Sequence, residues 1–197
     1  MFAGIIQNLG NVISYSNGEL EISTPLDLSD CKIGSSICCN GVCLTATEIK
    51  NKNKIFFFKV NLGEETLNRT NFSDILFDKT VHVNIEKSLK LGDEISGHFV
   101  YGHIDCITQI TDIKMLKNSW EFYFENFKNE NRKFIVEKGS IAINGISLTI
   151  ANEDKNNFSV SVIPHTYENT NLRYLKINDC VNIEFDYLAR FSIKDKD

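Results

Sequence analysis

Short segments in which β-branched and aromatic residues alternate with polar residues run along the whole chain, and turn-forming residues separate them. Alternation with a period of two is typical of half-buried β-strands. The pattern predicts strands over residues 4–14, 19–23, 36–44, 55–60, 81–85, 102–110, 119–124, 140–148, 158–162 and 181–185. Each half of the chain supplies five or six of them, so we expect an all-β protein.

The second half of the chain repeats the first. The segment SICCNGVCLT at 36–45 recurs as SIAINGISLT at 140–149, and VNIE at 83–86 recurs at 181–184. A period near 100 residues is too long for a solenoid unit and indicates a duplicated domain. We expect one domain over 1–92, a second over 93–187, and a short tail over 188–197. Small antiparallel sheets with this strand spacing commonly close into Greek-key barrels.

Turns and short helices complete this prediction. Asn-Gly pairs at 17–18, 40–41 and 144–145 accept positive φ easily and favour tight turns. Polar segments at 63–71 and 165–172 occupy matching places in the two repeats, and residues 64–68 favour a short helix. The tail is weakly periodic, so it forms either a short helix or a frayed end.

Composition narrows the function classes. The formal charge is −5, and no Lys/Arg run forms a basic face, which disfavours nucleic-acid binding. No apolar run approaches the length needed to cross a bilayer, and the first residues lack the pattern of a secretion signal. We therefore expect a cytoplasmic protein with no membrane partner. Six cysteines lack zinc-site spacing, so we expect reduced thiols and no metal site.

Two differences between the repeats mark candidate chemistry. His98 and His103 have no counterparts in the first repeat, and their spacing of five residues places them on opposite faces of an extended segment. They cannot bind one metal together without a bend; each is either a structural histidine or a proton carrier near neutral pH. Cys43 stands where the second repeat has Ser147, three residues beyond an Asn in each case. Both side chains are either structural or face a pocket, and no nucleophile-elbow, dinucleotide-binding or phosphate-loop motif accompanies them.

Five motifs taken together closely resemble the riboflavin synthase family of the alpha-chain type. They are MFAGI at the start, the doubled S-I-x-x-N-G-[VI]-[CS]-L-T, ETLNRTN at 65–71, GHFVYGHID at 97–105 and IPHT at 163–166. The resemblance extends from Met1 to about Arg190. It implies two tandem six-stranded Greek-key barrels, each binding one molecule of 6,7-dimethyl-8-ribityllumazine.

The resemblance also implies the reaction. A four-carbon unit passes from one lumazine to the other and gives riboflavin and 5-amino-6-ribitylamino-2,4-pyrimidinedione, so the expected enzyme is a transferase of riboflavin biosynthesis. Two like substrates explain two like barrels. The site must move protons and donate hydrogen bonds to the rings, and no cofactor is expected. Holding the rings face to face supplies much of the acceleration.

The family's motifs carry specific residues over to this chain. The expected contacts of the N-terminal barrel are Gly4, Ile5, Ile6, Cys43, Leu44, Thr45, Asn61, Leu62, Gly63, Glu64, Glu65 and Thr66. Those of the C-terminal barrel are Gly102, His103, Ile104, Lys138, Ser147, Leu148, Thr149, Val162, Ile163, Pro164, His165, Thr166 and Tyr167. The expected catalytic or catalysis-supporting set is Phe2, Cys43, His103, Ser147 and Asp186.

The resemblance further implies a homotrimer whose active sites form between the N-terminal barrel of one subunit and the C-terminal barrel of its neighbour. The short tail, compared with the longer helix common in the family, predicts a weaker trimer. Association with lumazine synthase is left open. The main alternative is a non-catalytic lumazine-binding antenna protein of the same fold. Retention of His98, His103 and the segment 147–149 favours the enzyme.

Overall fold

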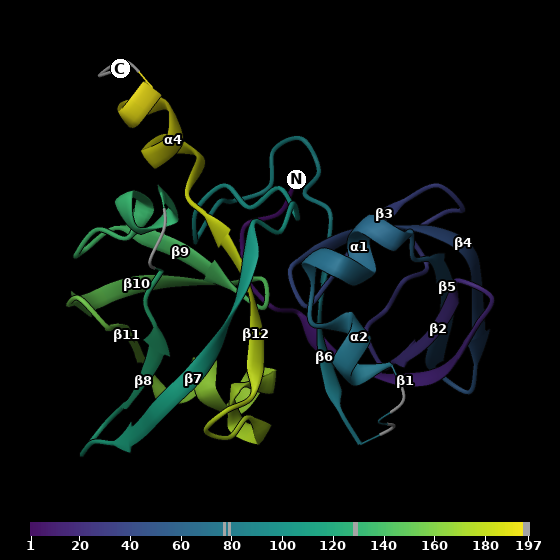
Figure 1. Ribbon diagram of the computed structural model, residues 1–197. Coiled ribbons are helices and arrows are strands. Elements are labelled where there is room, and N and C mark those ends of the chain that lie inside the picture. The colour runs from purple at the N-terminus through teal and green to yellow at the C-terminus, as the bar shows by residue number, and fades with distance from the viewer. Residues whose placement is uncertain (77, 79, 128–129, 195–197) are drawn as a thin grey trace.

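The chain folds into two closed six-stranded antiparallel barrels that lie side by side (Figure 1). The computed structural model describes residues 1–76, 78, 80–127 and 130–194. The first barrel consists of β1 (Asn8–Ser16), β2 (Glu19–Thr24), β3 (Ser36–Cys39), β4 (Val42–Lys52), β5 (Ile55–Asn61) and β6 (His82–Lys87). The second consists of β7 (Cys106–Met115), β8 (Trp120–Glu125), β9 (Ser140–Ile143), β10 (Ile146–Glu153), β11 (Asn157–Val162) and β12 (Cys180–Phe185).

The two barrels have the same topology. The strand order around the first is β1-β2-β5-β4-β3-β6, and the second repeats it with each strand number raised by six. The helical elements are α1 (Glu64–Arg69), α2 (Phe72–Ile75), η1 (Glu130–Phe134), α3 (Pro164–Asn169), η2 (Asn171–Tyr174) and α4 (Tyr187–Lys194). The predicted duplicated all-β fold and the short helix after residue 63 are confirmed.

Four predicted strands, 4–14, 36–44, 102–110 and 140–148, have the wrong bounds, and β7 begins only at Cys106. The segment 36–44 is a hairpin of β3 and β4, because Asn40 (φ 48°) and Gly41 (φ 82°) turn the chain; Asn144 and Gly145 do the same between β9 and β10. A two-residue turn of this kind does not interrupt the alternation, so the pattern alone merged the strands. The first strand begins at Asn8 rather than at Gly4, because the preceding residues cross to the other barrel.

Inward-facing apolar side chains fill each barrel. Leu20, Ile22 and Phe58 lie in the first core and are fully buried. The second core is more aromatic, and the rings of Phe124 and Phe158 stack with their centroids 5.2 Å apart. Each such side chain contributes roughly 1.5–3 kcal/mol of burial free energy, so each repeat has a core of its own.

A network of buried asparagines joins the two barrels. Asn84 Nδ2 in β6 donates to the carbonyl of Asn144 and to Asn171 Oδ1, each at 2.9 Å, and Asn171 N donates to Asn84 Oδ1 at 2.7 Å. The repeat supplies the counterpart: Asn182 Nδ2 in β12 donates to the Asn40 carbonyl at 2.8 Å. These carbonyls belong to the two hairpin turns, so the network satisfies turn peptides that the interface removes from water.

The turns themselves touch back to back. A Cβ atom on Gly41 would lie 2.7 Å from Gly145 N, and one on Gly145 would lie 2.7 Å from Gly41 N. Glycine is required at both positions because no side chain fits between the two backbones. The interface is therefore built from the same turn used twice.

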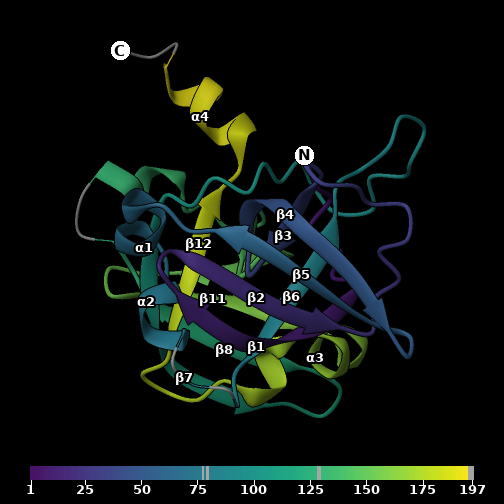
Figure 2. The same cartoon turned by 90° about the vertical axis from the view of Figure 1, so that its right-hand side faces the viewer.

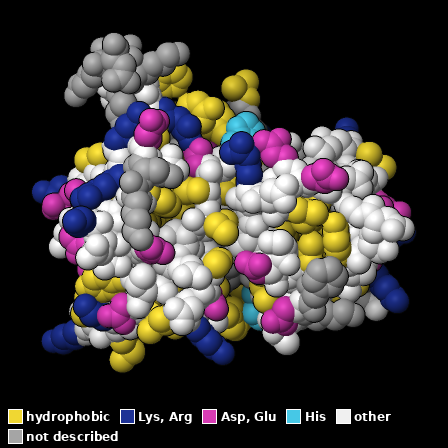
Figure 3. Space-filling view, in the orientation of Figure 1, with side chains coloured by type: hydrophobic (Ala, Val, Ile, Leu, Met, Phe, Trp, Pro, Cys, Tyr) yellow, Lys and Arg dark blue, Asp and Glu magenta, His cyan; other side chains and the backbone are white. Residues whose placement is uncertain are grey.

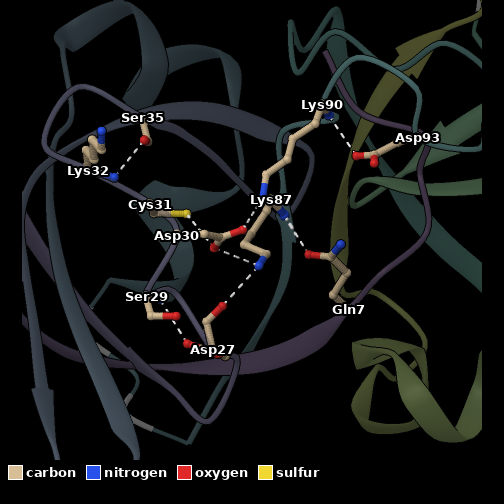
Figure 4. Close-up of polar contacts among 10 residues, drawn as sticks. All are labelled: Gln7, Asp27, Ser29, Asp30, Cys31, Lys32, Ser35, Lys87, Lys90 and Asp93. Atoms are coloured by element: carbon tan, nitrogen blue, oxygen red, sulfur yellow. Dashed lines mark hydrogen bonds and ion pairs between the residues drawn. The ribbon is translucent and has the colours of Figure 1, made fainter.

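The segment between the barrels is held by ion pairs (Figure 4). Asp30 contacts Lys87 Nζ at 2.9 Å and Lys90 Nζ at 2.5 Å. The hydrogen bonds from Lys90 and then Lys87 lower the pKa of the Asp30 carboxyl well below its usual range. Lys87 N also donates to Gln7 Oε1 at 2.9 Å, so the end of β6 is tied both to a loop of its own barrel and to residues 1–7, which precede β1.

We expect Asn84→Ala to lower the free energy of unfolding by about 2–4 kcal/mol, because it leaves the turn carbonyl of Asn144 and the amide N–H of Asn171 buried without partners. Denaturant unfolding measures the change. Asn68→Ala, at an exposed position of α1, is the control and should alter stability by under about 0.5 kcal/mol. Equal effects of the two substitutions would contradict the role given to the network.

Candidate functional site

The segment that precedes the first strand of each repeat lies against the opposite barrel. We call residues 1–7 and 97–105 the first and second leading segments. Gly102 O accepts a hydrogen bond from Cys43 N at 2.9 Å, and Gly4 O accepts one from Ser147 N at 2.8 Å. The two segments also pair with each other through a bridge between Phe2 and Val100. Each repeat thus donates residues to the other repeat's surface.

Gly4 and Gly102 permit this crossing. Their φ angles are +73° and +81°, in the region that favours glycine. A Cβ atom on Gly102 would lie 2.5 Å from Cys43 Cβ, and one on Gly4 would lie 2.7 Å from Ser147 Cβ. The glycines therefore bring the leading backbone into contact with the Cys/Ser position of the opposite barrel.

An open cavity of about 450 Å³ lies where the second leading segment meets the first barrel. One wall comes from β4 and α1, a second from the leading segment, and a third from α4. The lining residues are Val42, Cys43, Glu65, Thr66, Arg69, Thr70, Gly102, His103, Ile104, Asp105, Tyr187 and Arg190. We call it the first cavity.

A second cavity of about 500 Å³ lies at the matching place of the other repeat. Its residues Ile6, Gln7, His165 and Asn169 correspond by the repeat to Ile104, Asp105, Glu65 and Arg69 of the first cavity. The two cavities share no lining residue. The helices that flank them, α1 and α3, lie toward opposite sides of the molecule in Figure 2.

Of the residues expected for the N-terminal barrel, the first cavity takes Cys43, Glu65 and Thr66. Leu44 and Leu62 are buried in the first core. Thr45, Asn61, Gly63 and Glu64 are exposed. The expected grouping of Gly4, Ile5 and Ile6 with this barrel needs correction, since Ile6 packs against the second core and lines the second cavity.

The same exchange applies to the residues expected for the C-terminal barrel. Gly102, His103 and Ile104 line the first cavity instead. His165 lines the second cavity, and Tyr167 stacks on Trp120 with the ring centroids 3.9 Å apart. The remaining residues lie as follows: Leu148 and Val162 are buried in the second core, Ser147 and Thr166 are half-buried, and Lys138, Thr149, Ile163 and Pro164 are exposed.

The structure separates the expected catalytic set. Cys43 and His103 come together in the first cavity. Phe2 is fully buried in a small cluster with Cys38, Val100 and Ala142, so it acts on any ligand through packing. This cluster lies between the barrels and fixes where the two leading segments cross.

Ser147 meets a histidine outside the expected set. His98 Nδ1 lies 2.7 Å from Ser147 Oγ. Burial lowers the pKa of His98, and the Asp186 carboxylate opposes that shift, so the imidazole is neutral at pH 7. Its Nδ1 donates to the Ser147 hydroxyl or accepts from it, according to the tautomer. The Gly97-His98 pair in the sequence was the available signal, but only the tertiary fold joins it to Ser147.

Two buried carboxylates hold the leading segments. Glu184 in β12 accepts hydrogen bonds from the backbone N–H groups of Tyr101, Gly102 and His103 at 2.6, 2.8 and 3.0 Å. Glu86 in β6 accepts those of Ala3 and Gly4 at 2.8 and 3.1 Å. Burial raises the pKa of each carboxyl to about 7, although the N–H groups act in the opposite direction.

The last helix contributes residues that the motifs did not indicate. Arg190 in α4 pairs with Asp105, and Asp105 Oδ2 accepts the Phe185 amide N–H at 2.9 Å. Tyr187 packs against Tyr101 with the ring centroids 4.3 Å apart. These contacts seat α4 at the rim of the first cavity, where the second cavity has no comparable helix among its lining residues.

Other kinds of site find little support. The described residues contain no group of three or more His, Cys, Asp and Glu side chains placed to hold a metal ion. Within the same residues, no helix combines the length and apolar character that crossing a bilayer requires. On the face drawn in Figure 3, basic and acidic side chains are interspersed, so that face has no extended basic patch.

Comparison with known proteins decides the family. A family model described as "Lumazine binding domain" matches residues 3–88 and again 101–186, which are the two barrels. Riboflavin synthase of Brucella abortus (strain 2308) is 38% identical over 199 residues, covering 98% of this chain and 97% of its own. That of Chlamydia pneumoniae is 40% identical over 200 residues, covering 98% and 94%. The chain belongs to the riboflavin synthase family.

Solved structures show the same fold. The crystal structure of LumP complexed with riboflavin superposes with a TM-score of 0.79 at 22% identity, over 94% of this chain and 99% of that one. LumP complexed with 6,7-dimethyl-8-(1'-D-ribityl) lumazine gives a TM-score of 0.75, over 93% and 98%. The double barrel is thus shared with LumP, whose structures hold riboflavin and 6,7-dimethyl-8-(1'-D-ribityl) lumazine.

We expect Gly102→Ala to destabilise this family member and to distort the first cavity, because the new methyl group would occupy the space of Cys43. Gly92→Ala is the matched control: φ is also positive there (+96°), but nothing lies within 4 Å. Thermal and denaturant unfolding should show a loss larger by at least about 1–3 kcal/mol for Gly102→Ala. Equal losses would mean that backbone conformation alone requires glycine at 102.

The two buried glutamates predict a pH dependence of stability. Their pKa is 4.5 in an exposed chain and about 7 in the fold, so the folded state binds more protons between these values. The free energy of unfolding should therefore fall as pH rises from 4.5 to 7 and level off above 7, by at most roughly 3 kcal/mol for each carboxyl. Denaturant unfolding at pH 5, 6, 7 and 8 measures the slope, and Glu86→Gln with Glu184→Gln should flatten it.

Proposed function

We propose that the chain converts two molecules of 6,7-dimethyl-8-ribityllumazine into riboflavin and 5-amino-6-ribitylamino-2,4-pyrimidinedione. The observation that carries this proposal is the pair of repeat-related cavities, each built from one leading segment and the opposite barrel. A reaction between two identical molecules requires two binding sites of one kind. As a dismutation, it transfers four carbons within the substrate pair and consumes no external oxidant or reductant.

The residues of the first cavity suit a flat heterocycle with a polyol chain. The Gly102 backbone offers a close surface for a ring, while Thr66 and Arg69 supply hydrogen-bond donors for ring carbonyls or ribityl hydroxyls. His103 and Cys43 lie in the same cavity and are the groups nearest to a bound ring's edge in this proposal.

The second repeat contains the groups that would transfer the proton, Ser147 and His98. The 7-methyl group of one lumazine must lose a proton before its carbon attacks the partner ring. The Ser147–His98 pair provides a hydroxyl in contact with a neutral imidazole, which accepts a proton without first releasing one. The Asp186 carboxylate near His98 stabilises the imidazolium that results.

We further propose that the productive site forms between chains, in a homotrimer. The two cavities of one chain are lined by different residues, and the buried asparagine network lies between the barrels that carry them. In this proposal the first cavity of one chain faces the second cavity of a neighbour, and two rings stack across the contact between chains.

The six free thiols support a reducing, cytoplasmic location.

Incubation of the purified protein with 6,7-dimethyl-8-ribityllumazine tests the activity directly. Riboflavin absorbance should appear, with one riboflavin formed for every two lumazines consumed. Tight lumazine binding with no riboflavin formed over hours would favour the antenna function instead.

Cys43→Ala and Ser147→Ala should each slow turnover at least tenfold, a loss of about 1.4 kcal/mol or more in transition-state stabilisation. The matched control for the thiol is Cys31→Ala, since Cys31 packs at the edge of the first core away from both cavities. Steady-state kinetics on all three variants decides the assignment, which fails if Cys43→Ala and Ser147→Ala run at the parent rate.

Activity should also depend on association. Specific activity is expected to fall on dilution as chains separate, and sedimentation across the same dilution series should show the mass fall in parallel. A fully active monomer would refute the site shared between chains and leave the fold and the family unaffected.

A further inference from the structure

Glu86 and Glu184 are buried carboxylates at matching positions of the two repeats, and each is only 2% exposed. The donors that reach them are backbone N–H groups of the leading segments. Successive N–H groups around one carboxylate form an anion-binding concavity, here occupied by a side chain of the same repeat. The carboxylates therefore determine where the leading backbone lies.

Each of these contacts continues into the opposite barrel. The Gly102 N–H donates to Glu184, and the Gly102 carbonyl accepts from Cys43 N at 2.9 Å. In the other repeat, the Gly4 N–H donates to Glu86, and the Gly4 carbonyl accepts from Ser147 N at 2.8 Å. One glycine residue thus separates each carboxylate from the backbone of Cys43 or Ser147.

The two histidines are attached to the same segments. His103 N donates directly to Glu184 at 3.0 Å. His98 N donates at 3.2 Å to the carbonyl of Ala3, whose own N–H donates to Glu86. Each carboxylate is therefore linked to one histidine and to one member of the Cys43/Ser147 pair.

The ionised form of both carboxyls is costly inside the fold. Burial raises the pKa of both carboxyls to about 7, which means that ionisation inside the fold is unfavourable. The Asp105 carboxylate adds to this effect at Glu184, the Met1 ammonium opposes it at Glu86, and the Cys38 thiol faces both. The backbone N–H groups of the leading segments offset part of that cost.

We propose that Glu86 and Glu184 are positioning residues. Glu184 positions His103 and Cys43 at the first cavity, and Glu86 positions the Ser147–His98 pair where the first leading segment meets the second barrel. The proposal rests on the proposed function for its effect on turnover. Its effect on the leading segments does not depend on any activity. Each ionised carboxylate accepts several backbone N–H groups at once. It thereby holds the glycine, Gly4 or Gly102, whose carbonyl accepts the N–H of Ser147 or Cys43.

The test compares Glu184→Gln and Glu86→Gln with Asp154→Asn. Glutamine keeps the size of glutamate but has an NH₂ group in place of one carboxylate oxygen. The backbone N–H groups of the leading segment therefore lose one acceptor. Asp154 is the matched control, because it also accepts two backbone N–H groups, of Asn156 and Asn157, in an exposed turn away from both cavities.

Amide hydrogen exchange followed by NMR gives the first readout. In Glu184→Gln, exchange at residues 101–103 and at Cys43 should accelerate at least tenfold, while residues 3–4 and Ser147 keep their protection. Glu86→Gln should give the reverse pattern, and Asp154→Asn should change neither segment. Unchanged exchange in the targeted segment overturns the proposal, as does an equal rise in both segments.

Kinetics and unfolding give the second readout. With 6,7-dimethyl-8-ribityllumazine at saturation, kcat per folded molecule should fall at least tenfold in both glutamine variants and stay at the parent value in Asp154→Asn. A purely structural role predicts a loss of stability with kcat per folded molecule retained, and that result overturns the proposal. If the parent chain itself forms no riboflavin, the proposed function fails and the exchange pattern still decides the positioning role.

The unsubstituted chain supplies an independent measurement if a variant does not fold. Lowering the pH from 8 to 6 protonates both carboxyls, so exchange at 3–4 and 101–103, corrected for the intrinsic rate, should accelerate while the free energy of unfolding rises. Protection that is the same at both pH values contradicts the proposal.

Discussion

The arrangement of the whole molecule depends on how buried peptide groups find partners where the two barrels meet. Backbone amides and carbonyls in the hairpin turns at 40–41 and 144–145 are removed from water, and apolar side chains cannot pair with them. Asn84 and Asn182 provide that partnership across the interface, each from the last strand of its own barrel. Because an amide side chain both donates and accepts, one residue type used twice satisfies the two sides of a repeat-related contact.

Once the interface is fixed, the leading segments have one path. They cross between the barrels through the cluster around Phe2 and Val100, and their glycines touch Cys43 and Ser147. Every cavity wall that comes from a leading segment is therefore supplied by the opposite repeat. The duplication does more than copy a binding unit, because neither copy completes its cavity alone.

The repeats then diverge where chemistry is expected. The first cavity is lined by Cys43, by His103 and by residues of α4. In the second repeat, His98 forms a hydrogen bond with Ser147 instead. Two substrates of the same structure have different parts in a dismutation, since one gives carbon and the other receives it. The two repeats have nearly the same fold but different side chains at corresponding positions, which is consistent with one site for the donor and one for the acceptor of the four carbons. The buried glutamates, in contrast, are the same in both repeats, as expected for groups that hold backbone rather than react.

The sequence by itself determined the duplicated all-β fold, the family and some of the residues that line the cavities, because alternation, Asn-Gly turns and ordered motifs are local properties of the chain. It predicted that His98 and His103 lie apart on an extended segment, but the structure has no strand there, because β7 begins at Cys106 and Gly102 takes a φ of +81°. What only the tertiary structure decided is which residues meet: residues 102–104 lie with Cys43, residues 4–6 lie with the second barrel, and His98 bonds to Ser147. Contacts across some 50 to 140 residues depend on how two finished barrels dock, and that is set by buried hydrogen bonds between non-adjacent segments. The hydrophobic periodicity within one repeat does not predict these contacts between the repeats.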